Sequence, residues 1–174
     1  MKFAATLSVI PLLLTCSSAS AERMQEYSFP DYGFSFKAPA RLQMSKSGTA
    51  DHGYGVFLDR RTRHLQFPSE GRRYISVFAA MHWDGHDVAG LLAEYCTGGQ
   101  SGPAPNGLAF SHARSGACRE DNNGRTDVYV ISIDGMGGDT LDHIAQLHTN
   151  ASHFEADLKV FRGVLRSTRI FPPP

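Results

Sequence analysis

The chain has 174 residues, with 17 Lys and Arg residues against 17 Asp and Glu residues, so its formal net charge is zero. Hydrophobic residues make up 41% of the sequence and charged residues 20%, a composition that excludes a chain disordered throughout. Balanced charge argues against a general nucleic-acid-binding protein, which needs cationic surfaces to displace phosphate counterions. No apolar run reaches the roughly 18 residues of a membrane span, which excludes a multi-span membrane protein.

The N-terminal residues 1–21 have the pattern of a cleaved secretory signal peptide. Lys2 supplies a positive charge, residues 3–14 form a short apolar stretch, and the small residues before Glu22 match a signal peptidase site. We therefore expect a secreted, periplasmic protein without a transmembrane span after cleavage, in which residues 22–174 form a single domain. The alternative is a lipid anchor on Cys16, although the residue before this cysteine departs from the lipoprotein pattern.

Cleavage of the signal peptide leaves two cysteines, Cys96 and Cys118. An even pair in an oxidising compartment predicts a structural disulfide. The alternative, a redox pair, lacks the support of a Cys-x-x-Cys spacing.

Short strands are predicted in the first half of the chain. Residues 27–30 and 33–36 alternate aromatic with polar side chains around a turn, and Pro39 ends the second strand. A third strand is expected at residues 54–58, after a polar loop. The strand predicted at residues 74–81 is apolar on both faces, which places it in the middle of a sheet covered on both sides.

A helix and a hairpin follow. Asp87 is a predicted N-cap, and the apolar residues after it recur at helical spacing as far as Tyr95. The Gly- and Pro-rich residues 97–107 are expected to form a surface loop. Residues 117–121 and 125–133 flank an Asn-Asn-Gly turn, which predicts a hairpin whose second strand is again central.

The last third of the chain contains one ambiguous and one clear element. Residues 143–149 fit either a strand or a helix. A final helix is predicted from a capping box formed by Ser152 and Glu155 and from an apolar stripe that continues to Leu165. Together, these elements predict an α+β fold: a central, antiparallel-rich sheet flanked by two main helices in a single layered domain.

Both ends of the chain resemble PsbP/Mog1-like domains. The run at residues 32–36, which leads into Pro39, is similar to their opening strands, and residues 161–167 are similar to their final helix. The resemblance implies a non-enzymatic accessory or binding protein and gives no catalytic residue to carry over.

The densest group of metal-ligand side chains lies between the strand at 74–81 and the following helix. His82, Asp84 and His86 carry imidazole and carboxylate groups that suit Zn²⁺ or Ni²⁺. Their spacing matches no defined zinc motif, and the competing interpretation is an exposed turn that caps the helix. A metal site here therefore remains a hypothesis.

A second histidine group comprises His143, His148 and His153. If residues 143–149 form a strand, the first two side chains project to opposite faces and cannot share an ion. We expect exposed histidines on a sheet edge.

A basic segment surrounds residues 67–68 and is the predicted partner-contact patch. Guanidinium groups pair well with phosphate or carboxylate groups of an envelope component or an acidic protein. The alternative is a solvated loop. The residues of the patch are Arg60, Arg61, Arg63, Arg72 and Arg73.

No Gly-x-Ser-x-Gly, Walker or His-Glu-x-x-His motif occurs, so we expect no enzyme and no cofactor. The leading hypothesis is a non-enzymatic binding or accessory protein that contacts a protein or envelope partner, with an immunity-type inhibitor as one variant. The alternative is a metal-binding protein or metal-dependent enzyme centred on the segment that begins at His82.

Overall fold

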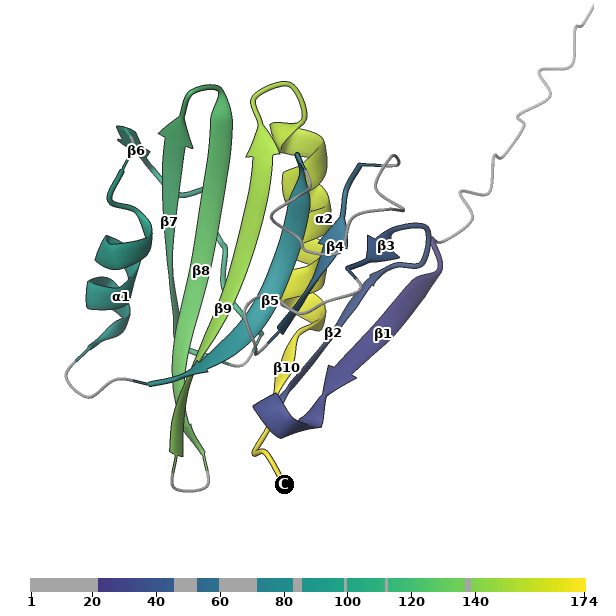
Figure 1. Cartoon of the computed structure of the whole chain (residues 1–174), viewed down its shortest axis with the longest axis vertical. Helices are drawn as coiled ribbons and strands as arrows, with labels where there is room; N and C mark the ends of the chain where they lie inside the picture. The colour runs from purple at the N-terminus through teal and green to yellow at the C-terminus, as the bar shows by residue number, and fades with distance from the viewer. Residues whose placement is uncertain are drawn as a thin grey trace, which may run out of the picture.

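The computed structural model describes residues 22–45, 53–59, 72–82, 86–98, 100–111, 113–136 and 139–174 (Figure 1). The strands are β1 (Met24–Phe29), β2 (Phe34–Pro39), β3 (Gln43–Met44), β4 (Gly53–Phe57), β5 (Tyr74–Met81), β6 (Gln100–Gly102), β7 (Ser115–Asn122), β8 (Arg125–Met136), β9 (Asp139–Asn150) and β10 (Arg169–Ile170). The helices are the 3-10 helix η1 (Pro30–Tyr32), α1 (Val88–Tyr95) and α2 (Phe154–Ser167).

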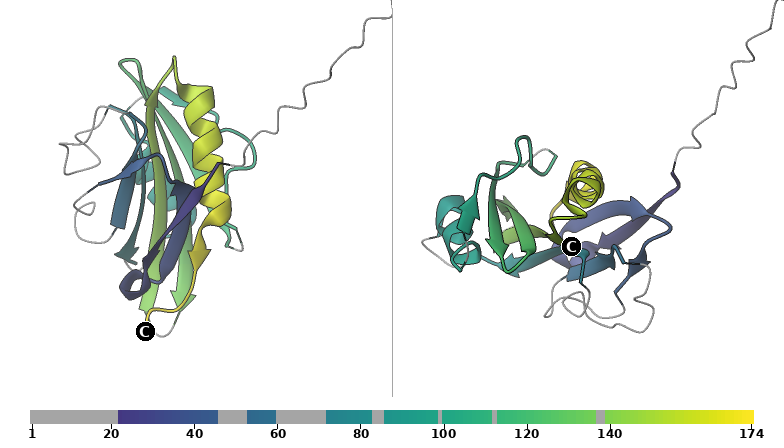
Figure 2. Two further views of the ribbon diagram at one scale, coloured as in Figure 1. Left: turned by 90° about the vertical axis from the view of Figure 1, so that its right-hand side faces the viewer. Right: turned by 90° about the horizontal axis from the view of Figure 1, so that it is seen from above.

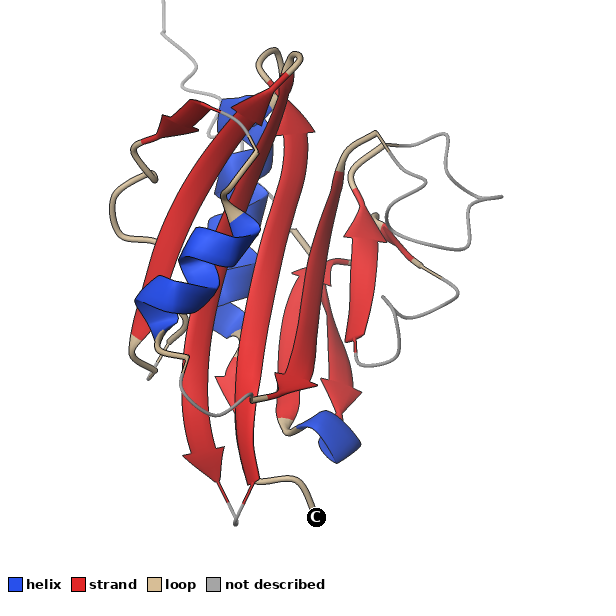
Figure 3. Cartoon of the chain, turned by 60° about the vertical axis from the view of Figure 1, so that its left-hand side comes forward, coloured by secondary structure: helices blue, strands red, loops and turns tan. Residues whose placement is uncertain are grey.

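These strands form two antiparallel sheets, one of three strands in the order β1-β2-β10 and one of seven in the order β3-β4-β5-β9-β8-β7-β6. Figure 3 shows α1 in front of the large sheet and α2 behind it. The predicted α+β class, with an antiparallel sheet between two main helices, is thereby confirmed. The separate small sheet is an addition that the sequence did not indicate.

The two predicted N-terminal strands are β1 and β2, and they pair in register with Tyr27 opposite Phe36. The turn between them ends at Gly33, whose positive φ of 65° favours glycine. The other edge of β2 pairs with β10, where Arg169 lies opposite Ser35. The small sheet therefore joins the first and last strands of the described chain.

Strands β5 and β8 are both internal to the large sheet, as their two apolar faces predict. The ambiguous segment is strand β9, which lies between β5 and β8 and is hydrogen-bonded to both. Pairing on both edges settles this segment as a strand although its sequence also fits a helical stripe.

One face of the large sheet carries the main hydrophobic core. The helix α2 and the strand β2 cover this face together, and Figure 2 shows α2, in yellow, on the same side of the molecule as the small sheet, in purple and blue. Buried apolar side chains from the large sheet, from β2 and from α2 meet on this face. The largest of them include Phe34, Phe36, Ile75, Leu147, Phe161 and Leu165.

The opposite face is covered by α1, which packs Leu91 against Ile131 and Ile144. The helix approaches β7 at Gly116, where an added Cβ would lie 2.6 Å from both Val88 Cγ1 and Leu92 Cδ1. Glycine at this position therefore permits the close contact between helix and strand.

Local signals in the hairpin and at the helix start have different outcomes. The predicted turn between β7 and β8 is present, with positive φ at Asn123 (49°) and Gly124 (78°). The predicted capping box is wrong, because His153 occupies the N-cap of α2 without a side-chain cap bond. The Ser152 hydroxyl instead donates to Asn150 Oδ1 at 2.7 Å, so it is engaged with the turn before the helix.

The Gly- and Pro-rich loop after α1 contains the short strand β6, which pairs with β7. Its three residues give too brief a pattern for prediction from sequence. Neither helix of the described chain has the length and apolar character needed to cross a membrane.

Candidate functional site

The segment with the predicted metal ligands joins the end of β5 to the start of α1. His82 directly follows the last residue of β5, and Asp87 caps the helix as expected, since its Oδ1 accepts from the Gly90 N–H at 2.7 Å. Asp84 lies outside the described residues. The segment leads from the end of β5 into α1, which lies on one face of the large sheet.

A pocket of about 430 Å³ lies between this junction and α1. Its rim includes Met81, which is 60% exposed, although large apolar side chains are usually buried. The floor is formed by Leu91 and Ile144, and the polar wall by Glu94 and Asp142. The pocket therefore combines an apolar floor with carboxylates at its side.

The imidazole of His82 pairs with a carboxylate from a distant part of the sequence. Its Nδ1 lies 2.7 Å from Asp142 Oδ1, and both side chains are largely buried. Asp142 is on β9 opposite Ala80 of β5, so only the strand register brings it to the site. Sequence reasoning missed Asp142 because no local pattern reports that register.

His86 pairs separately with Glu94 on α1, at 3.5 Å between Nδ1 and Oε1, and both side chains are exposed. Each of the two histidines therefore has its own carboxylate neighbour. Among the residues that the structure describes, no group of three or more His, Cys, Asp or Glu side chains gathers into a metal-binding arrangement. The metal hypothesis thus depends on Asp84.

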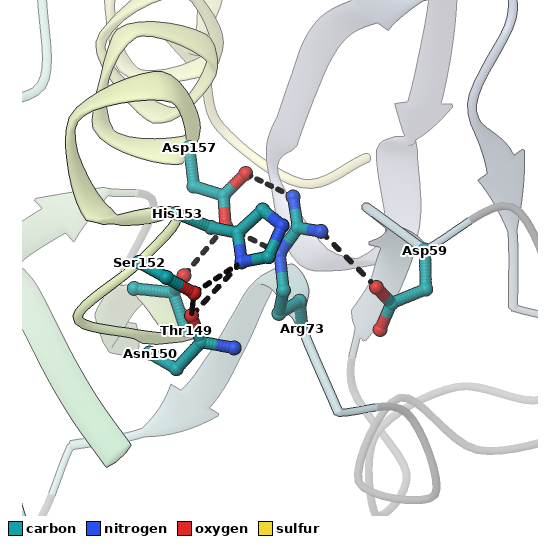
Figure 4. A network of polar contacts seen from close by, with 7 residues as sticks. All are labelled: Asp59, Arg73, Thr149, Asn150, Ser152, His153 and Asp157. Carbon is teal, nitrogen blue, oxygen red and sulfur yellow. Dashed lines mark hydrogen bonds and ion pairs between the residues drawn. The ribbon is translucent and has the colours of Figure 1, made fainter. Parts of the chain in front are cut away.

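Arg73, which the sequence assigns to the partner-contact patch, is held inside the molecule (Figure 4). Its Nε and NH2 groups donate to the two carboxylate oxygens of Asp157 on α2, at 2.7 and 2.5 Å. NH1 donates to Asp59 at 3.2 Å, and the Thr149 hydroxyl donates to Asp157 at 2.5 Å. The hydrogen bond with Asp157 also raises the pKa of Arg73. Because its donors are used within the molecule, this guanidinium connects the start of β5 to α2 instead of facing a partner.

Arg72 is the one other member of the patch within the described residues. It is exposed next to Arg73 and is free to contact a partner. Arg60, Arg61 and Arg63 lie outside the described residues, so their contribution to a patch remains a prediction.

A disulfide joins Cys96, at the C-terminal end of α1, to Cys118 on β7, with an S–S distance of 1.99 Å. It fastens the helix to the large sheet on the side of the β5–α1 pocket.

The two histidines of β9 lie on opposite faces of the sheet, as strand geometry requires. The expectation that they are exposed on an edge is wrong, because β9 is internal and His143 is only 2% exposed. His148 stacks on Tyr74 at 4.9 Å between ring centroids, and its Nδ1 lies 2.7 Å from Asp127 Oδ1. Burial lowers the pKa of His143 and raises that of Tyr74 to about 12.

Solved structures similar to this chain include the following three proteins. The cyanobacterial PsbP (CyanoP) of Synechocystis sp. PCC 6803 is 14% identical, with a TM-score of 0.50, and the match covers 91% of this chain and 99% of that one. LpqN of Mycobacterium tuberculosis, described as involved in cell envelope biogenesis, is 13% identical, with a TM-score of 0.54 and coverage of 86% and 92%. The Ran-binding protein Mog1p of Saccharomyces cerevisiae is 11% identical, with a TM-score of 0.50 and coverage of 87% and 97%.

A scan against protein-family models gives no match, and a comparison with curated proteins gives none either. At the identities of the three structural neighbours, similarity establishes a shared fold and leaves activity open. The structures nevertheless agree with the resemblance seen at both ends of the sequence: the chain has the PsbP/Mog1 fold.

Proposed function

We propose that this protein is exported and acts as a non-enzymatic binding or accessory protein through surface contacts with a protein or envelope partner. The observation that carries the proposal is the PsbP/Mog1 fold, because the solved proteins that share it include one described as Ran-binding and one as involved in cell envelope biogenesis. Export is supported by the signal-like N-terminus and by the disulfide, which forms in oxidising compartments.

Two surfaces are candidates for the partner contact. The first is the β5–α1 pocket, where exposed Met81 lies above an apolar floor. The second is the basic segment, which now comprises Arg60, Arg61, Arg63 and Arg72, since Arg73 is paired within the molecule. The pocket suits an apolar anchor of a partner protein, whereas the arginines suit an acidic one.

Affinity capture from native envelope extracts tests the proposal and separates the two surfaces. The full protein, isolated after export, serves as bait beside a Met81→Glu variant and a variant with Ser at Arg60, Arg61, Arg63 and Arg72. An Arg125→Gln variant at the β7–β8 hairpin is the control. We expect one partner to bind the unmodified protein saturably. The control variant should retain this partner, and one of the two surface variants should lose it.

A partner retained equally by all variants would remove both surfaces from the proposal. Absence of any saturable partner for the unmodified protein would count against a binding role altogether.

A metal-dependent role at the β5–α1 junction is the second candidate, because His82 and His86 both lie there with a carboxylate beside each imidazole. Elemental analysis of protein purified without an affinity tag tests this role. Stoichiometric metal, together with a melting temperature that rises on adding Zn²⁺, is the expected result if the site exists. Substoichiometric metal and an unchanged melting temperature would eliminate this role.

A further inference from the structure

A second pocket, of about 650 Å³, lies where the C-terminal end of α2 and β10 meet β2 and β8. Three cationic side chains line it, those of Lys37, Arg166 and Arg169, against the single carboxylate of Asp134. The apolar residues Ile170 and Phe171 are also part of the lining. The pocket is therefore cationic although the whole chain has no net charge.

The cations of this pocket are available for a ligand. Neither Arg166 nor Arg169 forms a side-chain hydrogen bond or ion pair with any residue in the described part of the chain, and both are exposed. Lys37 lies 3.8 Å from Glu26, but both side chains are about half exposed, and pairs of this kind are weak.

Two backbone carbonyls at the C-terminal end of α2 repel an anion less than free carbonyls would, because each accepts a hydrogen bond from a side-chain hydroxyl. The Arg166 carbonyl accepts from the Ser111 hydroxyl at 2.9 Å. The Val164 carbonyl accepts from the hydroxyls of Ser167 and Thr168, at 2.8 and 2.9 Å. These bonds reduce the partial negative charge that a helix C-terminus without donors would present.

Asp134 is likewise engaged with neighbours on the sheet. Its Oδ2 accepts from the Ser132 hydroxyl at 2.7 Å and lies 3.7 Å from His143 Nδ1. The carboxylate is thus directed in part toward its own strand and its neighbour β9, and three cations outweigh it in the pocket.

We propose that this pocket binds a phosphate group carried on a small organic moiety. Two guanidinium groups and an ammonium group can donate to several oxygens of one anionic phosphate group, and guanidinium binds phosphate in a bidentate manner. The apolar lining at Ile170 and Phe171 suits the carbon skeleton attached to it. The phosphate comes either from a soluble phosphomonoester or from a phospholipid headgroup at the envelope.

Equilibrium dialysis of the full protein with labelled glycerol 3-phosphate tests the binding chemistry. We expect saturable binding that weakens as salt screens the charges and that falls at least about tenfold in an Arg166→Gln/Arg169→Gln variant. Arg125→Gln, at the opposite end of β8 from Asp134, is a matched control that removes one exposed arginine and leaves binding unchanged. Thermal melting of each variant verifies that it is folded.

Co-sedimentation with phosphatidylglycerol vesicles, compared with phosphatidylcholine vesicles, distinguishes the two sources of phosphate. If the unmodified protein sediments with phosphatidylglycerol vesicles and the double variant does not, the ligand is the phospholipid headgroup. If the protein binds glycerol 3-phosphate but not the vesicles, the ligand is a soluble phosphomonoester. The proposal is overturned if neither probe binds, or if the folded double variant binds both as the unmodified protein does. Such a failure leaves the partner contacts of the β5–α1 pocket and the basic segment untouched, because they involve other residues.

Discussion

Arg73 lies between two carboxylates, those of Asp59 and Asp157. Both oxygens of Asp157 accept from it, and the Asp157 side chain is only 4% exposed, so removal of the arginine leaves a buried carboxylate with one hydroxyl donor. We expect Arg73→Ala to lower the free energy of unfolding by about 3 kcal/mol, measured by urea denaturation.

Arg72→Ala is the matched control for this prediction, because the same residue type is exposed one position earlier. Arg72→Ala is expected to change the free energy of unfolding by no more than about 0.5 kcal/mol. An Arg73→Met/Asp157→Leu variant should recover part of the loss, since it removes the buried Asp157 carboxylate together with its cationic partner. Equal effects of the two alanine substitutions would show that the ion pair contributes nothing.

His143 is expected to make stability depend on pH. The ring faces the carboxylates of Asp134 and Asp142 and the carbonyl of Tyr32, but burial is the largest influence and lowers its pKa. Below the ordinary value near 6.5, the unfolded chain then binds more protons than the folded one. Protonation of the unfolded chain therefore favours unfolding. As a result, the free energy of unfolding decreases as pH falls below about 6.5.

Urea midpoints at pH 7.5 and 5.5 measure this effect. The midpoint of the unmodified protein should fall at the lower pH, and the fall should be smaller in His143→Gln, which cannot take up the proton. A fall of the same size in both proteins would assign the pH dependence to other groups.

At the scale of elements, two Gly-to-Ala substitutions are expected to change stability in opposite directions. One glycine lies at the contact between α1 and β7, and the other lies in α2. A Cβ at Gly116 would lie 2.6 Å from Val88 and Leu92, so Gly116→Ala should destabilise the fold by about 1–3 kcal/mol. A Cβ at Gly163, within α2, meets nothing within 4 Å, so Gly163→Ala should stabilise the fold by about 0.5–1 kcal/mol. Thermal melting compares them, and destabilisation by both would contradict the packing argument.

The disulfide fastens the other end of α1 and closes a loop between cysteines 22 positions apart. In the chain-entropy model, such a loop stabilises a fold by about 3 kcal/mol. We expect a Cys96→Ser/Cys118→Ser variant to lose about this amount in urea denaturation. Reaction of both cysteines with a thiol reagent in unreduced, denatured protein would show that the bond does not form.

Prediction from sequence succeeded for most local signals, with the capping box of α2 as the exception, and failed where the structure depends on distant partners. Apolar side chains on both faces revealed β5 and β8 as central strands, and the Asn123–Gly124 turn and the Asp87 cap are set by neighbouring residues. The pairings of Asp142 with His82 and of Asp157 with Arg73 join residues 60 and 84 positions apart. No local pattern reports such distances, so the polar environment of the candidate site could not be predicted.

The boundaries of the exported protein are a prediction at the scale of the whole molecule. If the signal peptide is cleaved as proposed, protein isolated from the periplasm should have the mass of residues 22–174 with Cys96 and Cys118 oxidised. Intact-mass spectrometry measures this directly. A diacylglyceryl adduct on Cys16 would instead establish a membrane-anchored form.

The pairing of β2 with both β1 and β10 has a consequence for biogenesis. Ser35 and Arg169 lie opposite each other, so the small sheet stays incomplete until nearly the whole chain has emerged. Apolar side chains of β2 and α2 share one core, and neither can bury its surface in the absence of the other. Late closure of this kind delays folding during synthesis, and if the chain is exported as proposed, it keeps the polypeptide extended during translocation.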